Sequence, residues 1–329
     1  MSKRAVTIDR AWPQRRPMLF GARRLLALSP AQASFAARGF ASEDPARRQV
    51  LETVGQTFIA GYNAALHANA PADLSRWIVT VPDDLRGFAA EGAAMASAVT
   101  DALPFQSARL PQMLAQFERE FTYLVHVGAG WALARVPWHR RRILAALDPI
   151  HFWLAYDGLG FHDCYFNHVK VLKGWRRSPS GYVGRACDQG VGRALWFVSG
   201  GSPRLAAASI RSLAVDRAGD LFSGLGLAMA YAGPTSSDDF AEALKLARHE
   251  ACALGQGIAF ACEARARAGY IPSNTQLAAK AIGFEATALA RLAREAREGL
   301  PEMEPDTPRY EFWRRRVTEA VARAMGAPV

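Results

Sequence analysis

The chain has 329 residues, half of them hydrophobic, so it is long enough to bury a large core. No run of about 18 apolar residues is present, which excludes a transmembrane helix bundle. The formal net charge of +10 at pH 7 indicates an anionic partner or a solvated basic surface. Four cysteines without a CxxC pair make no disulfide framework, so a reducing, cytoplasmic location is expected.

The N-terminal 24 residues are basic and do not form a complete export signal, because Arg23 and Arg24 interrupt the apolar stretch. We predict that they form a basic arm. Residues 25–300 are predicted to form a single helical-repeat domain. Residues 301–329 are predicted to form an acidic connector followed by a basic C-terminal helix.

A small-residue motif returns through most of the chain, usually as Gly-x-Gly followed by alanines and an aromatic residue. Its first glycines are Gly55, Gly92, Gly128, Gly158, Gly190, Gly224 and Gly255. The intervals of 30 to 37 residues match one helix–turn–helix unit of an α-solenoid. Glycine weakens a helix, so its recurrence indicates close contacts between helix backbones. The sequence therefore predicts an all-α fold of stacked, TPR-like helical hairpins; chance recurrence in a Gly- and Ala-rich chain is the alternative.

The clearest unit has a helix at 224–231 and a return helix at 238–247, with Ser236 or Ser237 as the N-cap. The next unit, residues 251–282, has the same plan. These two units predict a helix, a turn and a return helix in each repeat.

Other local patterns are scarce. Two β-branched runs, Arg76–Val81 and His168–Leu172, are the only candidate strands. No Gly-x-Gly has the third glycine of a dinucleotide-binding loop. A Gly-x-Ser-x-Gly elbow, a P-loop and a HExxH helix are all missing from the sequence.

Three polar residues, Asp157, His162 and Arg193, are candidate catalytic groups. They stand beside apolar, glycine-bearing segments that belong in the interior, where an unpaired polar group costs about 1–3 kcal/mol. Such groups either pair with one another or line a cavity that admits a ligand. We expect these three side chains to converge on one cavity from different repeats.

Eight further residues are candidate ligand-binding groups. The aromatic ones lie near glycine-containing helices, where a pocket can open, and are Trp131, Trp153, Phe161, Trp196 and Tyr231. The acidic ones are Asp188, Asp216 and Asp220. The alternative is that the aromatic residues only fill the core and that the aspartates form ion pairs with arginines such as Arg217.

Two metal-dependent activities are alternatives. His126, His162-Asp163 and a later aspartate follow the ligand order of HD-type phosphohydrolases. Asp216 and Asp220, four residues apart, resemble part of the Mg-diphosphate site of class I terpene cyclases. The first pattern lacks the apolar residues that usually precede the HD motif, and no second metal motif accompanies the second pattern, so no metal and no cofactor are predicted.

Tryptophan and basic residues alternate in three clusters, at 138–142, 173–177 and 313–316. Such clusters suit phosphates or an anionic lipid surface, or else form a solvated face with anchoring tryptophans. No nucleic-acid motif accompanies them, so no specific nucleic-acid partner is predicted. Peripheral membrane contact remains an alternative.

Several segments together resemble one known family. They are Arg38-Gly39-Phe40, Arg86-Gly87-Phe88, Gly128-Ala129-Gly130-Trp131, Gln189-Gly190-Val191-Gly192-Arg193 and the stretch 220–233. This set is similar to the bacterial family catalogued as domain of unknown function 1702, over roughly residues 22–290. The resemblance implies an association with enediyne polyketide gene clusters, and it supplies no catalytic residues.

The resemblance implies an accessory protein that binds an apolar, polyene-like intermediate of polyketide-type metabolism in a helical pocket, to protect it or to assist a rearrangement. The alternative is a non-enzymatic scaffold whose concave face docks an acidic protein or a membrane surface. A closed apolar pocket beside Asp157, His162 and Arg193 would favour the first hypothesis. A smooth basic groove without a pocket would favour the second.

Overall fold

The computed structural model describes residues 24–104, 108–174, 180–213, 215–302, 304 and 307–326. Within these residues the protein is a single all-α domain without β-strands, as predicted. The predicted basic arm, except for Arg24, lies outside the described residues, as do Trp175, Arg176 and Arg177 of one basic cluster. None of the described helices is both long enough and apolar enough to cross a membrane.

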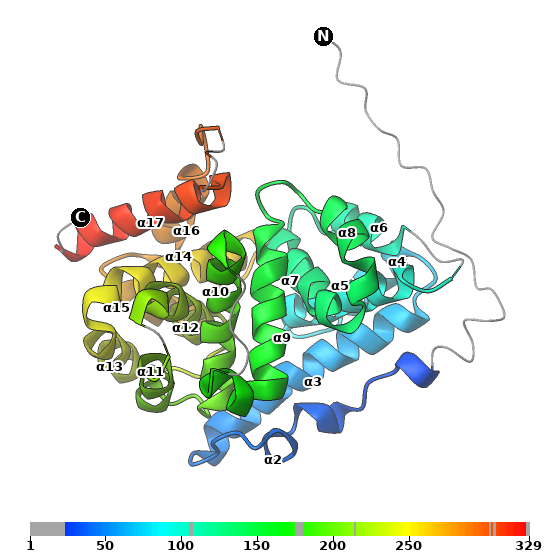
Figure 1. The fold of residues 1–329 in the computed structure, drawn as a ribbon, viewed down its shortest axis with the longest axis horizontal. Helices are drawn as coiled ribbons and strands as arrows, with labels where there is room; N and C mark the ends of the chain where they lie inside the picture. Colours follow the sequence, from blue (N-terminus) through cyan, green and yellow to red (C-terminus); the bar gives the residue numbers. More distant parts are fainter. Residues whose placement is uncertain are drawn as a thin grey trace, which may run out of the picture.

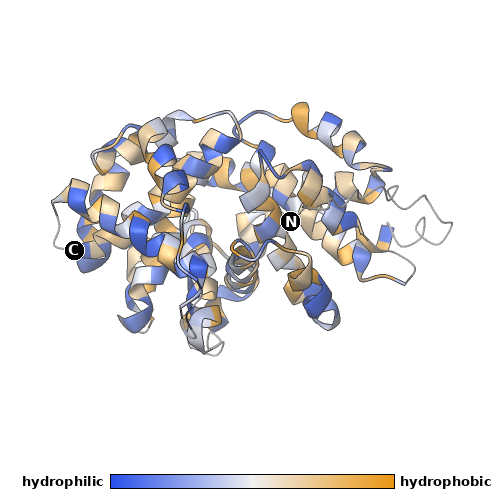
Figure 2. Ribbon diagram, turned by 90° about the horizontal axis from the view of Figure 1, so that it is seen from above, coloured by the Kyte–Doolittle hydropathy of each residue, from blue (hydrophilic) through white to orange (hydrophobic). Residues whose placement is uncertain are grey.

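Seven long helices of the described chain succeed one another, and each packs against the next (Figure 1). They are α3 (Pro45–His67), α5 (Arg86–Asp101), α7 (Thr122–Arg135), α9 (Trp153–Leu172), α10 (Gly181–Val198), α12 (Ala218–Ala232) and α14 (Ala251–Arg267). Figure 2 shows that helices of the fold carry both hydrophobic and hydrophilic residues, as expected of helices that bury one face.

Shorter helices connect most of the long ones. They are α4 (Pro71–Val79), α6 (Arg109–Gln116), α8 (Arg140–Ala145), α11 (Pro203–Arg211), α13 (Ser237–Ala247) and α15 (Ser273–Ala281). Near the N-terminus lie η1 (Pro30–Ala33) and α2 (Phe35–Arg38). At the C-terminal end α16 (Ala286–Glu295) and α17 (Arg309–Met325) pack against α14. Short 3-10 turns complete the chain: η2 (Pro137–His139), η3 (Val215–Arg217) and η4 (Arg248–Glu250).

Neighbouring long helices contact each other through glycines, and the same pairing of glycine with backbone carbonyl recurs between helices. We call this pairing the register and its glycines the register glycines. A Cβ added to Gly158 of α9 would lie 2.1 Å from the carbonyl oxygen of Val127 on α7. A Cβ added to Gly130 of α7 would lie 2.1 Å from the carbonyl oxygen of Ala155 on α9. Each of these glycines therefore faces the carbonyl three residues before the glycine of its partner. The predicted close contacts between helix backbones are confirmed.

The same reciprocal register recurs along the stack. It links Gly61 with Gly92, Gly160 with Gly190, Gly192 with Gly224, and Gly226 with Gly257. Gly128 packs on Glu91 and Ala94 of α5, where alanine replaces the partner glycine. In each Gly-x-Gly of α7, α9, α10 and α12 the first glycine contacts the preceding long helix and the second the following one.

Two glycines of the sequence motif have other neighbours. Gly55 faces the side chain of Ala33 in η1, and Gly255 faces Val321 of α17. The glycines that hold the register on α3 and α14 are instead Gly61 and Gly257.

The two candidate strands are wrong. Arg76–Val81 spans the end of α4 and the turn after it, and His168–Leu172 completes α9. Ile78 and Val171 are buried on these helices, so packing of one helix face outweighs their β-branched preference.

The two hairpins predicted in most detail are confirmed. α12 and α13 form the first, and α14 and α15 the second. Ser236 caps α13, because its hydroxyl accepts a hydrogen bond from the amide of Asp239 while the Asp239 carboxylate accepts one from the amide of Ser236.

One stripe of the long helices faces the interior. Its members stand three or seven residues after the glycine by which a helix contacts the preceding long helix. The two positions are four residues apart, so they lie on one face, one turn apart. These glycines are Gly92, Gly128, Gly158, Gly190, Gly224 and Gly257. At the earlier position are Met95, Trp131, Phe161, Arg193, Leu227 and Phe260, and at the later one Tyr165, Phe197, Tyr231, Ala264 and Arg135, the last of which is exposed. All of these residues line two adjoining cavities, so the repeat that packs the helices also builds the interior surface.

Candidate functional site

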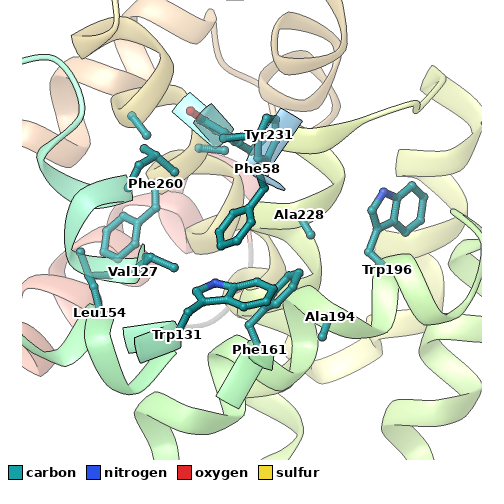
Figure 3. Close-up of a cluster of buried hydrophobic side chains, with 14 of the residues drawn as sticks. Phe58, Val127, Trp131, Leu154, Phe161, Ala194, Trp196, Ala228, Tyr231 and Phe260 are labelled. Carbon is teal, nitrogen blue, oxygen red and sulfur yellow. The ribbon is translucent and has the colours of Figure 1, made fainter. Parts of the chain in front are cut away.

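The larger cavity has an empty volume of about 750 Å³, and α3, α5, α7, α9, α10 and α12 contribute side chains to its wall. Its wall is rich in aromatic side chains, of which Figure 3 shows Phe58, Trp131, Phe161 and Tyr231. The ring of Trp131 lies between Phe58 and Phe161, with centroid distances of 4.5 and 5.1 Å. A mostly apolar lining with a few polar groups is typical of sites for apolar small molecules.

The smaller cavity has an empty volume of about 540 Å³. Its apolar wall is formed by Leu124, Val127, Leu154, Phe260, Ala264 and Trp313. Arg193, Leu227 and Tyr231 line both cavities, so these three side chains stand where the two cavities adjoin.

A buried ion cluster lies at this junction. The guanidinium of Arg193 pairs with the carboxylate of Asp157, and its Nη2 atom lies 3.8 Å from Oε1 of Glu91. The same Oε1 accepts a hydrogen bond of 2.9 Å from the indole nitrogen of Trp131. Arg193 also covers the ring of Phe161 at 5.1 Å. One cation thus holds two carboxylates that come from different repeats.

The cluster is almost closed to solvent, and burial dominates its electrostatics. Glu91 is 3% exposed and Arg193 is 7% exposed. Burial raises the pKa of Glu91 to about 7, although the charge of Arg193 and the hydrogen bond from Trp131 oppose the shift. Burial also raises the pKa of Asp157, against the attraction of Arg193. Glu91 therefore exchanges its proton near neutral pH.

Tyr231 adds an unpaired hydroxyl group to this site. The residue is 4% exposed, and its buried hydroxyl makes no hydrogen bond with the described protein atoms. A Cβ on Gly87 would come within 2.0 Å of that oxygen, so the glycine leaves the space that the hydroxyl occupies. The guanidinium of Arg265 covers the ring at 3.7 Å. Burial raises the pKa of Tyr231, so the phenol keeps its proton and can donate a hydrogen bond.

The predicted catalytic residues are only partly brought together. Asp157 and Arg193 form an ion pair and line the same cavity. His162 lines neither cavity; its ring packs edge-on against Trp131 at 5.7 Å, and its Nδ1 lies 3.5 Å from the carboxylate of Asp163. A catalytic role for any of the three stays a prediction.

The predicted aromatic ligand-binding residues divide in the same way. Trp131, Phe161 and Tyr231 line the larger cavity. Trp196 stands apart from them in Figure 3 and donates a hydrogen bond of 2.7 Å to the carbonyl of Gly233. Trp153 packs edge-on against the ring of Tyr182, with a centroid distance of 4.7 Å, and lines neither cavity.

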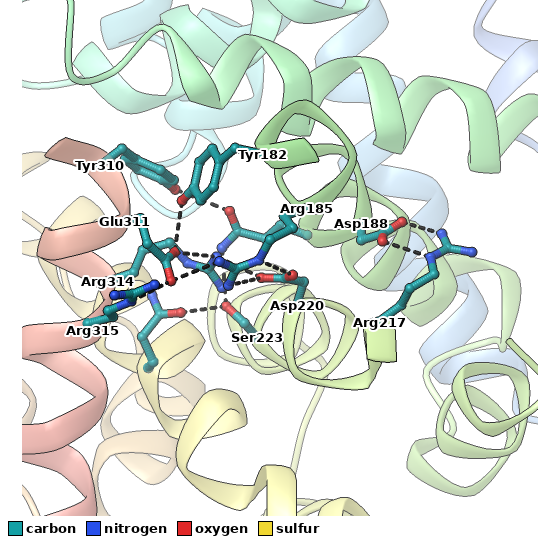
Figure 4. A network of polar contacts seen from close by, with 12 residues as sticks. Tyr182, Arg185, Asp188, Arg217, Asp220, Ser223, Tyr310, Glu311, Arg314 and Arg315 are labelled. Carbon is teal, nitrogen blue, oxygen red and sulfur yellow. Dashed lines mark hydrogen bonds and ion pairs between the residues drawn. The ribbon is translucent and has the colours of Figure 1, made fainter. Parts of the chain in front are cut away.

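Of the predicted aspartates, Asp220 belongs to a second polar network between α10, α12 and α17, and Asp188 belongs to a separate ion pair beside it (Figure 4). Asp188 pairs with Arg217, and Asp220 pairs with Arg185 at 2.9 Å and with Arg314 at 2.7 Å. Asp216 lines a surface depression beside this network. The carboxylates of Asp188 and Asp220 are thus engaged by arginines that join neighbouring helices.

The two metal-dependent alternatives find no matching geometry. The Nδ1 atom of His126 lies 2.7 Å from the carbonyl of Thr122, and its Nε2 accepts a hydrogen bond from the amide of Asp148. Over the part of the chain that the structure describes, no group of three or more His, Cys, Asp and Glu side chains is arranged to hold a metal ion.

Glu91 is the site residue that sequence reasoning missed. The signal is its position: it directly precedes the register glycine Gly92, and the other charged residues of α5 stand only at its two ends. Polar residues occupy the same position on four other long helices, as Asp157, Gln189, Ser223 and Gln256. Because this position turns toward the interior, a charge there marks the site.

Comparison with known proteins gives a family assignment and nothing more specific. No curated protein and no solved structure matches the chain. A family model described as a protein of unknown function, DUF1702, matches residues 20–321, a span that contains every residue lining the two cavities. The chain therefore belongs to the DUF1702 family.

Proposed function

We propose that this protein binds an apolar, polyene-like intermediate of enediyne- or polyketide-type secondary metabolism between its helices. It would act as an accessory protein that protects the ligand or assists its rearrangement. The observation that carries the proposal is the aromatic cavity of about 750 Å³ with an ion cluster at one end. The link to polyketide metabolism rests on the family resemblance.

The lining explains the ligand class. A conjugated chain can lie against the rings of Phe58, Trp131 and Phe161 where they line the cavity, because aromatic rings favour contacts with other π systems. Removing such a chain from water contributes about 25 cal/mol per Å² of apolar surface. A ligand longer than the larger cavity can extend past Arg193 and Tyr231 into the smaller one.

The scaffold alternative has less support. Its docking surface would be the inward stripe of the long helices, and that stripe lines cavities whose side chains are mostly buried. One surface feature favours a peripheral contact: the Trp138 side chain is 74% exposed beside exposed Arg141 and Arg142. This patch is compatible with the binding proposal, since it lies outside the cavity lining.

Titration with cis-parinaric acid, a fluorescent polyene fatty acid, tests the proposal. We expect saturable binding, with a rise in probe emission and quenching of tryptophan emission. Ala228→Leu should weaken binding at least about tenfold, or about 1.4 kcal/mol, because Ala228 lies on the wall of the larger cavity.

The matched control makes the same change at Ala60, which is exposed on α3, and should leave the affinity unchanged. Binding that does not saturate would contradict the proposal. So would equal affinities of the wild-type and Ala228→Leu proteins, provided that circular dichroism shows both to be folded.

A further inference from the structure

We propose that Glu91 and Tyr231 move a double bond in a bound, unsaturated carbonyl compound, with Glu91 carrying the proton and Tyr231 holding the carbonyl oxygen. This inference rests on the proposed binding of an apolar ligand in the larger cavity. It adds a reaction and a substrate class: an apolar ketone or thioester with a double bond one carbon away from conjugation.

Glu91 is placed to exchange a proton with a ligand. It lines the larger cavity, and its contacts with Trp131 and Arg193 both involve Oε1. Oε2 is thus left for the ligand. The wall around Glu91 is mostly apolar, so few other groups compete for the proton that it removes, and that proton can return to the same molecule.

Tyr231 supplies the hydrogen-bond donor that the developing charge needs. Its hydroxyl is buried without a partner, and the residue lines the same cavity as Glu91. The hydroxyl lies against Gly87, one helical turn before Glu91 on the same face of α5. A buried donor without a partner normally costs stability, so its retention points to a ligand oxygen as its acceptor.

The reaction needs no cofactor. The Glu91 carboxylate removes a proton from the carbon between the carbonyl and the double bond. The electron pair of that C–H bond forms a new C=C bond, and the negative charge moves to the carbonyl oxygen, where the hydroxyl of Tyr231 donates a hydrogen bond. The C=O bond then re-forms while the far carbon of the original double bond takes the proton back from Glu91. The product is the conjugated isomer, and the carboxylate is regenerated.

The electrostatics support this role. A pKa of about 7 lets Glu91 act as a base and then as an acid at neutral pH. The charged groups that face it are Arg193 of α10 and Asp157 of α9, and Tyr231 of α12 is the nearby titratable phenol. From α3 the cavity receives Phe58 and Ile59, which do not titrate.

The probe is the N-acetylcysteamine thioester of a β,γ-unsaturated decenoic acid, a linear chain like parinaric acid. Conversion is followed by the ultraviolet absorbance of the conjugated thioester. We expect turnover by the wild-type protein above the rate in buffer. Glu91→Gln should lower that rate at least about 100-fold, and Tyr231→Phe about 100-fold.

Both variants should bind parinaric acid within about threefold of the wild type, since neither changes the size of the cavity. Tyr62→Phe, a buried tyrosine of α3 outside the cavity lining, is the matched control and should keep the full rate. The wild-type rate should rise with pH through about 7, because the ionised form of Glu91 is the base. Trp131→Phe should move this midpoint to higher pH, because the indole stabilises the carboxylate.

The outcomes separate the two proposals. If parinaric acid binds and no conjugated thioester forms, or if the thioester does not displace parinaric acid, the reaction is refuted while the binding function stands. Full activity of Glu91→Gln would refute it as well. If parinaric acid itself fails to bind, the proposed function fails and the reaction with it.

Discussion

Gly224→Ala is expected to destabilise the protein by about 3 kcal/mol or more, whereas Gly219→Ala on the same helix should cause no loss. A Cβ on Gly224 would stand 1.9 Å from the carbonyl oxygen of Gln189, and backbone cannot move away without separating α12 from α10. At Gly219 a Cβ meets only the flexible carboxylate of Glu250, at 2.9 Å. Alanine there gains about 1 kcal/mol of helix propensity.

Urea denaturation of both variants measures the difference. Gly226→Leu extends the test to the contact between α12 and α14, where a Cβ would lie 2.1 Å from the carbonyl oxygen of Leu254. Gly224→Ala and Gly219→Ala proteins of equal stability would show that the glycine register does not hold the stack together.

Arg193→Met is expected to cost about 3–5 kcal/mol at about pH 8, because it leaves Asp157 and Glu91 buried without their cation. The loss should be smaller at about pH 5. The pKa of Glu91 is already raised to about 7 and that of Asp157 is raised by burial, and both rise further once the guanidinium is gone. At acid pH the two groups take up protons in the folded variant, so the uncompensated charge disappears.

Unfolding free energies of wild type and variant at the two pH values give this comparison. The matched control is Arg76→Met, whose ion pair with Asp73 lies on the surface and should contribute less than about 1 kcal/mol at either pH. A loss of the same size at pH 5 and pH 8 would mean that Arg193 acts through packing alone.

The stack of helices could be predicted from the sequence because the glycine contacts that form it are local and repeated. A glycine must stand wherever two backbones meet, so the contact points of α7, α9, α10 and α12 appear directly as Gly-x-Gly. The strand predictions failed for the opposite reason. The runs around Ile78 and Val171 have the composition of strands, and only the neighbouring helices decide that their β-branched side chains are buried on helical faces.

The site was harder to predict from the sequence, because its residues depend on which face of each helix points to the interior. Asp157 and Phe161 lie one turn apart on the inward face of α9, whereas His162 follows Phe161 directly and points elsewhere. Trp196 similarly lies outside the stripe that contains Arg193 and Phe197. The distance in sequence from the register glycines distinguishes the residues that line the cavities from those that do not. This rule can be applied only once the contacts between helices are known.

The net charge was also harder to interpret than the fold. An excess of arginine predicted an anionic partner or a solvated surface. Several arginines are instead buried and join distant segments by ion pairs or by hydrogen bonds to carbonyls; they are Arg109, Arg193, Arg265 and Arg314. Arginine suits this task because its fork of donors reaches more than one partner.

Native mass spectrometry of protein purified without denaturant from its own host tests the central claim most directly, which is that the helices enclose an apolar ligand. We expect an added mass on the order of a few hundred daltons that disappears on denaturation and that is absent from the Ala228→Leu protein. A sample incubated with parinaric acid verifies that non-covalent complexes survive the measurement. If that sample retains its adduct while the native protein shows only the mass of the bare chain, the claim of a resident apolar ligand is contradicted.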